Sequence, residues 1–321
     1  MAEFKVLLVE DIDHRAVAML SAVADVTIAS AFDPKTLTEE TRDKHGMIFR
    51  AQGYASRELM LACPNLKVLA RHGVGVDNID VQAATELGIW VVNTPLANNE
   101  SVAEQAMGML LCLSKRIMEA DRALRRGEWK ARFRLIGQEV KGKTLGVVGS
   151  GRVGTRLAEM AFFGFQMNVL YRDVVANPRL EQATGARRVE LDELLAESDY
   201  VSLHVPALPE TEKMIGGREL ALMKPTAYLL NLARGSVVDE AALIEALQKG
   251  GIAGAGLDVY EIEPVQPDNP LFKLDNVVCS PHMASLTKEG TFAMAMVVKD
   301  VMAVLQGRAP EFPVNHPAHL R

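Results

Sequence analysis

The chain has 321 residues, of which 49% are hydrophobic and 24% are charged, and its formal net charge is −6 at pH 7. This length is enough for two domains with sizeable cores, and the composition is that of an ordinary globular protein. The acidic balance, without long runs of one sign, argues against a nucleic-acid-binding or membrane-surface protein, for which a basic patch is expected.

The cysteines and the N-terminal residues bear on the compartment. Cys63, Cys112 and Cys279 are far apart and odd in number, which favours a reducing environment over a disulfide or metal framework. We therefore expect no metal site. The chain begins without a signal-peptide pattern and no apolar run approaches the length of a membrane span, so a cytoplasmic location without membrane association is expected.

The first part of the chain alternates short apolar runs with amphipathic segments such as 34–41 and 81–87. This alternation predicts an open α/β sheet of buried parallel strands separated by helices. The expected strands are residues 5–9, 26–29, 47–50, 67–71 and 89–92.

A strongly apolar segment follows. Ser101-Val-Ala-Glu104 predicts the start of a helix through a capping box, and the run 107–113 is hydrophobic on nearly all sides. Such a helix should be buried. An interdomain hinge, a subunit interface and an ordinary core helix all remain open interpretations.

A second α/β series begins after Gly142, and a last helix is expected over residues 288–306. Two series predict two doubly wound domains, and the cleft between two such sheets is a natural place for chemistry. The expected strands of this series are residues 145–148, 168–171, 200–203, 227–231, 254–259 and 277–280.

The strand 145–148 enters a G-x-G-x-x-G turn and a helical pattern leaves it. Gly149 allows the tight turn, Gly151 lets a pyrophosphate approach the backbone, and Gly154 lets helix and strand pack closely. Asp173 ends the next strand, where an acid binds the adenosine ribose. The pattern favours a dinucleotide site over a purely structural turn. Asp173 should repel a 2′-phosphate and so favours NAD over NADP, whereas the adjacent Arg172 favours the reverse.

Polar side chains follow three later strands. Arg234 is flanked by small residues and suits bidentate binding of a carboxylate, or alternatively an interdomain salt bridge. Asp258 ends the next strand, and Glu263 in the following loop could simply be solvated. His282 could be a packing or surface residue, but beside a carboxylate it can trade a proton near neutral pH. With a dinucleotide fold, Arg234, Glu263 and His282 suit removal of a hydride and a proton from a carbon bearing hydroxyl and carboxylate.

These motifs together resemble the D-2-hydroxyacid dehydrogenase family, which includes D-3-phosphoglycerate dehydrogenase, hydroxypyruvate and glyoxylate reductases, and D-lactate dehydrogenase. The resemblance implies a flavodoxin-like substrate domain, residues 1–99 plus 288–321, and a Rossmann NAD domain, residues 100–287, with the active site in the cleft between them. The matching runs, in family order, are Arg71-His-Gly-Val-Gly-Val-Asp-Asn-Ile-Asp80, Val92-Asn-Thr-Pro95, Ser101-Val-Ala-Glu104, the glycine fingerprint, Leu203-His-Val-Pro206, Asn231-Leu-Ala-Arg234-Gly, Gly256-Leu-Asp258-Val-Tyr and Ser280-Pro-His282.

The resemblance also implies individual roles. His282 would be the acid/base, Glu263 the carboxylate that favours its protonated form, and Arg234 the group that binds the substrate carboxylate and polarises the C2 oxygen. The backbone N–H groups of Val74 and Gly75 would hold the other side of the carboxylate. Cofactor contacts would come from Arg152 and Val153 at the pyrophosphate, Asp173 at the ribose, Asp258 at the nicotinamide carboxamide, and His204, Pro206, Leu232, Ala233, Arg234 and His282 along the cofactor.

The substrate is expected to be a small D-2-hydroxy acid or 2-oxo acid of the hydroxypyruvate, glyoxylate or 3-phosphoglycerate type. Arg50 corresponds to a substrate-facing position of phosphoglycerate-type relatives, although a surface salt bridge is an alternative. The run Gln52-Gly-Tyr54 departs from those relatives and puts phosphate recognition in doubt.

The resemblance further implies a homodimer formed through residues 101–126, with Trp129 and Phe133 either in interface packing or over a neighbouring subunit's substrate. Two alternative functions are an NAD-binding corepressor-like protein of the same fold and a phosphite-type dehydrogenase.

Overall fold

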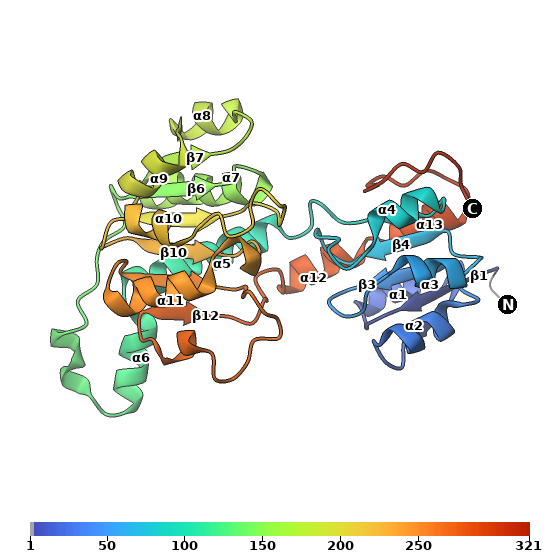
Figure 1. Ribbon diagram of the computed structural model, residues 1–321, viewed down its shortest axis with the longest axis horizontal. Helices are drawn as coiled ribbons and strands as arrows, with labels where there is room; N and C mark the ends of the chain where they lie inside the picture. The colour runs from blue at the N-terminus through green and yellow to red at the C-terminus, as the bar shows by residue number, and fades with distance from the viewer. Residues whose placement is uncertain (1–2) are drawn as a thin grey trace. The chain divides into compact units, whose positions relative to one another are not determined.

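The computed structural model describes residues 3–321 and divides the chain into two compact units (Figure 1). The first comprises the chain up to Asn98 together with Leu286–Arg321, and the second comprises Asn99–Ser285. Each unit is built around one parallel β-sheet, so the predicted class of two parallel-sheet α/β domains is confirmed.

The sheet of the first unit has the order β2-β1-β3-β4-β5, and every neighbouring pair is parallel. This is the flavodoxin-like order, in which helices must cover both faces because each connection crosses over the sheet. One face packs against α1 and α13, and the other against α2, α3 and α4. The elements are β1 Phe4–Leu8, α1 His14–Leu20, β2 Ala24–Ile28, α2 Pro34–Thr41, β3 Gly46–Phe49, α3 Arg57–Ala62, β4 Val68–Arg71, α4 Val81–Glu86, β5 Trp90–Val92, α12 Lys288–Ala295 and α13 Val298–Leu305.

The open edge of β5 is covered by the C-terminal tail. Val92 pairs antiparallel with Pro313, and the amide of Val314 donates to the carbonyl of Val91 at 2.8 Å. The buried Asn315 adds a further bond, because its side-chain oxygen accepts from the amide of Val91 at 2.7 Å. The tail thus satisfies the backbone groups that an edge strand would otherwise expose.

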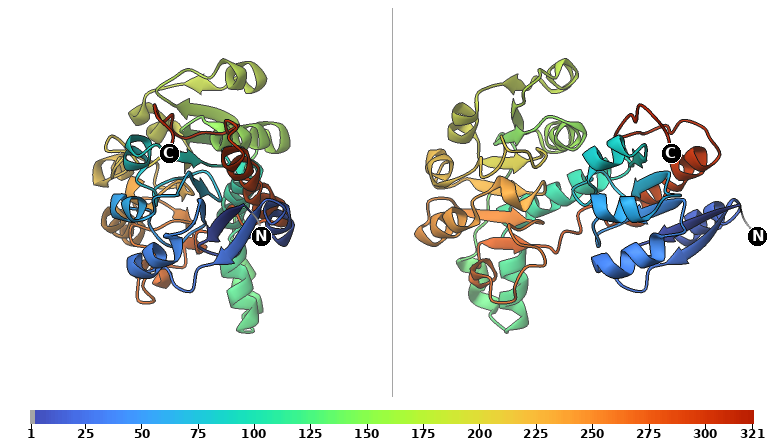
Figure 2. Two further views of the ribbon diagram at one scale, coloured as in Figure 1. Left: turned by 90° about the vertical axis from the view of Figure 1, so that its right-hand side faces the viewer. Right: turned by 45° about the vertical axis from the view of Figure 1, so that its right-hand side comes forward.

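The sheet of the second unit has the order β12-β11-β10-β9-β6-β7-β8, a Rossmann arrangement in which the chain reverses direction beside β6. Helices lie on both sides of this sheet, as the two views of Figure 2 show. Its elements are α5 Asn99–Ser114, α6 Ile117–Arg125, η1 Trp129–Phe133, β6 Thr144–Val148, α7 Arg152–Glu159, η2 Met160–Gly164, β7 Asn168–Arg172, α8 Pro178–Thr184, β8 Arg187–Arg188, α9 Leu191–Glu197, β9 Tyr200–Leu203, α10 Gly217–Leu222, β10 Tyr228–Asn231, η3 Gly235–Val237, α11 Glu240–Lys249, β11 Gly254–Leu257, η4 Pro270–Lys273 and β12 Val277–Cys279.

Two local predictions are wrong, and one short strand was not predicted. Helix α5 begins at Asn99, two residues before the expected start, so the buried Ser101 lies inside its first turn. The expected helix over 288–306 is two helices, separated by a tight turn where the amide of Val297 donates to the carbonyl of Met294. The short strand β8 was not expected, because two arginines carry no apolar strand signal.

The apolar run within α5 is largely buried, as its composition predicts, and packs against the sheet of its own unit. Arg116 in the left-handed conformation separates α5 from α6, and α6 projects from the body of its unit in each view (Figures 1 and 2). Within residues 3–321, no helix is long and apolar enough to cross a membrane.

Candidate functional site

The glycine fingerprint joins β6 to α7, and two of its three glycines are required by their surroundings. Gly149 has a positive φ of 95°, and a Cβ there would lie 2.7 Å from the carbonyl oxygen of His204. A Cβ on Gly154 would lie 2.1 Å from the carbonyl oxygen of Gly149, so only glycine lets α7 pack this closely. A Cβ on Gly151 would meet open space, which leaves the backbone accessible to a ligand.

The start of α7 fits the pyrophosphate of a dinucleotide. The backbone N–H groups of Arg152 and Val153 donate to no acceptor in the described part of the chain. Such N–H groups, at the positive end of a helix dipole, bind anions. The predicted place of Arg152 and Val153 beside the pyrophosphate remains a prediction.

Asp173 follows β7 and lies against the same loop. Its Oδ2 accepts from the backbone N–H of Ser150 at 2.7 Å and from the Ser150 hydroxyl at 3.0 Å. A carboxylate in this place suits hydroxyls of a ribose and opposes a 2′-phosphate. The neighbouring Arg172 is engaged by Glu190 at 3.3 Å, which diminishes its opposing influence.

His282 and Glu263 are brought together by the loops after β12 and β11. The Nδ1–H of His282 donates to Oε2 of Glu263 at 2.7 Å, and Oε1 of Glu263 accepts from the backbone N–H of Tyr260 at 3.1 Å. Partial burial acts to raise the pKa of Glu263, but the bonds from His282 and Tyr260, together with the charge of Arg234, lower it. The carboxylate therefore stays ionised, and the imidazole keeps Nε2 available for proton transfer.

The backbone beneath His282 is held by Asp258, which is 1% exposed. His282 has a positive φ of 49°, a conformation that surrounding contacts must maintain. The Asp258 carbonyl accepts from the amide of His282 at 2.7 Å, while its carboxylate accepts from Ser280 Oγ at 2.5 Å and from the amides of Met283 and Ala284, each at 2.9 Å. Its Oδ2 accepts one of these bonds and can accept another, so the predicted carboxamide contact is chemically possible.

Arg234 follows β10 in a loop that Asn231 holds from within. The buried amide of Asn231 donates to the Arg234 carbonyl at 3.0 Å and accepts from the Ala233 N–H at 3.1 Å. The guanidinium lies near enough to Glu263 to lower the pKa of that carboxyl. Sequence reasoning gave Asn231 no role; the signal available was a polar residue at the end of an otherwise apolar strand.

The residues predicted to line the cofactor lie at the carboxyl ends of two neighbouring strands. His204 and Pro206 follow β9, and Leu232 and Ala233 follow β10. Burial lowers the pKa of His204 to about 4, so this imidazole is neutral at physiological pH. Its Nε2 lies 2.8 Å from the Ser202 hydroxyl. These strand ends adjoin the glycine loop, because β9 pairs directly with β6.

The predicted substrate residues of the first unit also lie beyond strand ends. Arg50 follows β3 and donates to the carbonyl of Asp11 at 3.3 Å, while Val74 and Gly75 follow β4. The backbone N–H groups of Val74 and Gly75 donate to no acceptor in the described residues. They are therefore available to an anion.

The imidazole of His72, between β4 and that loop, is 2% exposed, and neither ring nitrogen has a hydrogen-bond partner in the described chain. Burial, reinforced by the positive charge of Arg50, lowers its pKa from 6.5 to about 4. The neutral imidazole is thus the form that the fold accommodates.

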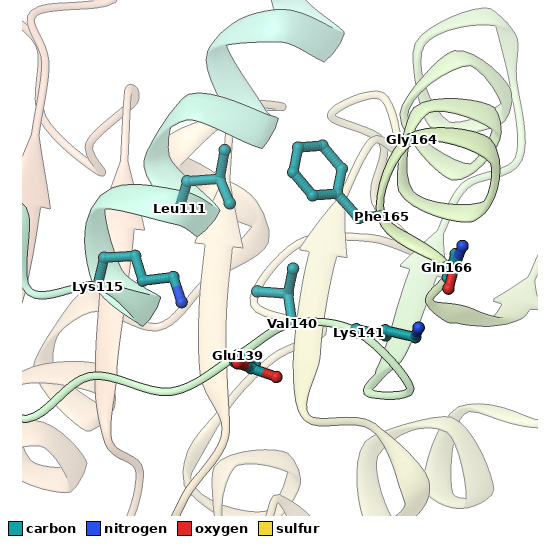
Figure 3. Close-up of a pocket in the computed structure, with 8 residues that line it drawn as sticks. All are labelled: Leu111, Lys115, Glu139, Val140, Lys141, Gly164, Phe165 and Gln166. Atoms are coloured by element: carbon teal, nitrogen blue, oxygen red, sulfur yellow. The ribbon is translucent and has the colours of Figure 1, made fainter.

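A separate hollow of about 380 Å³ lies elsewhere in the second unit (Figure 3). Val140 and Lys141, in its wall, precede β6, whereas the glycine loop follows β6. The hollow is therefore at the opposite end of this strand from the predicted cofactor residues. Within residues 3–321, no group of three His, Cys, Asp or Glu residues is arranged to hold a metal ion.

The fold and the two loops after β6 and β12 define an NAD-dependent dehydrogenase of the two-unit α/β class. The model of the D-isomer specific 2-hydroxyacid dehydrogenase NAD binding domain matches residues 107–284. The chain belongs to this D-isomer specific 2-hydroxyacid dehydrogenase family, as its sequence motifs predict.

Relatives that match nearly the whole chain support this family membership. A glyoxylate reductase from Thermococcus litoralis is 42% identical, with 97% of this chain and 96% of that protein covered. A D-3-phosphoglycerate dehydrogenase from Archaeoglobus fulgidus is 41% identical, but 98% of this chain covers only 60% of that protein. A D-lactate dehydrogenase structure from Aquifex aeolicus, complexed with NAD and lactic acid, is 32% identical with a TM-score of 0.89, and the match covers 98% of this chain and 100% of that chain.

These relatives are hydroxy-acid oxidoreductases, so the predicted enzyme class and NAD as cofactor are confirmed. The corepressor-like and phosphite-type alternatives are not favoured by them.

Stability should depend on pH through His72. The pKa of His72 is lower in the folded chain than its unfolded value of 6.5. The stability that the neutral imidazole allows is therefore fully present above pH 6.5 and is lost as the pH falls towards 4. The loss is at most about 3 kcal/mol. This loss of stability is measured by comparing the thermal unfolding midpoints of wild-type and His72→Leu protein across this pH range. The wild-type midpoint should fall more steeply on acidification, and parallel curves would contradict the assignment.

Proposed function

We propose that the protein reversibly reduces small 2-oxo acids to D-2-hydroxy acids with NADH, using His282, Glu263 and Arg234 as its catalytic groups. The observation that carries this proposal is the 2.7 Å bond between His282 and Glu263, with Arg234 lowering the pKa of the same carboxyl. The unit containing the chain ends would bind the substrate, and the unit of Asn99–Ser285 would bind the cofactor.

When bound, NADH would supply the hydride for reduction of the carbonyl carbon. His282, protonated and steadied by Glu263, gives the proton at Nε2 to the carbonyl oxygen. Arg234 binds the substrate carboxylate and stabilises negative charge that develops on the oxygen. The N–H groups of Val74 and Gly75 hold the carboxylate. In the oxidative direction the neutral imidazole accepts the proton from the hydroxyl.

The cofactor would be held by the residues that the sequence singles out. The glycine loop with Arg152 and Val153 would bind the pyrophosphate, and Asp173 the ribose. His204, Pro206, Leu232, Ala233 and Asp258 would contact the remainder. The engagement of Arg172 by Glu190 supports a preference for NAD over NADP.

Replacement of His282 by Asn should lower kcat about 10²- to 10⁴-fold and reduce NADH affinity far less, because the main loss is that of proton transfer. Glu263→Gln should lower kcat less, because the imidazole keeps Nε2 for proton transfer but loses the carboxylate that orients its ring. Steady-state kinetics across pH and NADH fluorescence titration measure both effects. Near-wild-type turnover in His282→Asn would refute the mechanism.

The loop after β3 favours a substrate without phosphate. Glu10, beyond the end of β1, accepts bonds from the backbone N–H groups of Ala51 and Gln52, the latter at 2.7 Å. These N–H groups adjoin Arg50, at the position that faces the substrate in phosphoglycerate-type relatives. A carboxylate already bound there takes up donors that a phosphate would need and repels its charge. Glyoxylate and hydroxypyruvate are therefore the substrates that we propose.

A substrate panel tests this choice. With NADH, kcat/KM should be at least about 10-fold higher for glyoxylate or hydroxypyruvate than for phosphohydroxypyruvate. Glu10→Gln should narrow that difference by removing the negative charge, whereas Glu40→Gln, which changes a carboxylate on α2, should not. Equal or better use of the phosphorylated acid by wild-type protein would refute the choice.

We also propose a homodimer in the cytoplasm, formed through the arm, defined here as α6 and η1. Exposed apolar side chains gather on the arm and just beyond it: Ile117, Met118, Leu124, Trp129, Phe133 and Ile136. Ion pairs such as Arg126–Glu128 and Arg134–Glu128 lie beside them. An apolar patch bordered by both signs of charge suits a second copy of the same surface.

Light scattering after size exclusion should give twice the chain mass for wild-type protein. Leu124→Glu, which puts a charge on the arm at a side chain that is 58% exposed, should shift the mass towards that of one chain. Leu61→Glu is the matched control, because Leu61 is 57% exposed but lies on α3 in the other unit. A monomeric wild-type protein would refute the dimer.

A further inference from the structure

Two motifs of the first unit have no role in the mechanism so far: the arginine that opens Arg71-His-Gly-Val-Gly75, and Asn93-Thr94 within Val92-Asn-Thr-Pro95. Arg71 is the last residue of β4 and Asn93 directly follows β5. These two strands are neighbours in the sheet, because β4 pairs with β5. They meet at the loop of residues 72–75, which follows β4.

All four carbonyls of this loop accept hydrogen bonds from these two motifs. Arg71 donates from Nη1 to the carbonyl of His72 and from Nε to that of Gly75, each at 2.7 Å. The Gly73 carbonyl accepts from the N–H of Thr94 at 3.0 Å and from its hydroxyl at 3.2 Å. The Val74 carbonyl accepts from the side-chain amide of Asn93 at 2.6 Å.

The two kinds of backbone group in this loop therefore differ in their hydrogen bonding. Its carbonyls are all engaged by the protein, while the N–H groups of Gly73, Val74 and Gly75 donate to no acceptor within residues 3–321. Gly73 reaches this arrangement with φ of 136°, which favours glycine. Successive unpaired N–H groups form an anion-binding concavity, and fixing the carbonyls keeps those dipoles in place before the anion arrives.

We propose that Arg71 is a positioning residue for the substrate carboxylate: it spans the loop and holds the N–H groups of Val74 and Gly75 in the orientation that receives the anion. This inference rests on the proposed function. The guanidinium suits the task because two donors on its planar fork are fixed relative to each other and reach carbonyls three residues apart. A lysine offers a single flexible point of attachment.

The test uses the full-length protein with Arg71→Lys, Arg71→Ala and the control Arg57→Gln, whose arginine pairs with Glu86 on the surface of the same unit. For both Arg71 variants, KM for glyoxylate should rise about 10- to 100-fold, as expected for the loss of hydrogen bonds from a charged group. KM for NADH should change less than about 3-fold, because the cofactor residues lie in the other unit. Arg57→Gln should match wild type in both constants.

Chemical rescue separates positioning from general stability. Added guanidinium should lower the raised KM of Arg71→Ala towards the wild-type value and leave Arg71→Lys unaffected. Asn93→Ala, which leaves the Arg71 bonds intact but frees the Val74 carbonyl, should raise KM for glyoxylate in the same direction. It provides the evidence if the Arg71 variants do not fold. Wild-type KM for glyoxylate in the variants that fold overturns the inference.

Failure of the proposed function can be distinguished from failure of the positioning role of Arg71. If wild-type protein turns over no 2-oxo acid, the function fails, and the positioning role is judged by binding of oxalate, a carboxylate probe, measured by calorimetry in the presence of NADH. Weaker oxalate binding by Arg71→Lys than by Arg57→Gln supports the role. Equal binding by the two variants, or no binding by wild-type protein, overturns it.

Discussion

A buried carboxylate, Asp258, supports the most demanding part of the site. It accepts bonds from Ser280 and from the amides on the far side of His282, while its own carbonyl accepts the amide of His282. Without these bonds the positive φ of His282 would have no compensation. The imidazole meets Glu263 because this backbone is fixed, so the proposed proton-transfer pair depends on a residue that is almost wholly inaccessible to solvent.

In other loops, too, polar side chains bind backbone groups and so fix the loop. Asn231 occupies both the donor and acceptor groups of the backbone around Arg234, and Arg71, Asn93 and Thr94 occupy the carbonyls of the loop after β4. In each case a polar side chain at a strand end determines which backbone groups remain available. Parallel sheets make this possible, because their carboxyl ends gather several loops at one edge.

Two acids in this arrangement lie where their negative charge would oppose a phosphate group. Glu10 takes up the backbone donors beside Arg50, and Glu190 engages the arginine next to Asp173. Each acid would oppose a phosphate at a place where an arginine, considered alone in the sequence, suggests one: on the substrate in the first case and on the cofactor ribose in the second. The groups around an arginine therefore matter as much as the arginine itself in judging which anion it could recognise.

Much of the fold follows from the sequence, because buried parallel strands are continuous apolar runs and the glycine fingerprint specifies its own turn. The chain alone also indicated the family and NAD, and it singled out Arg234, Glu263 and His282. It could not reveal the start of α5, the division of the last helix, or the parts taken by Asn231, Glu10 and Arg71. Those depend on contacts between residues distant in sequence, because a backbone group is available to a ligand only if no remote side chain has bound it. Local pattern thus determined which elements and chemical groups exist, whereas tertiary structure decided which of their hydrogen bonds are already satisfied.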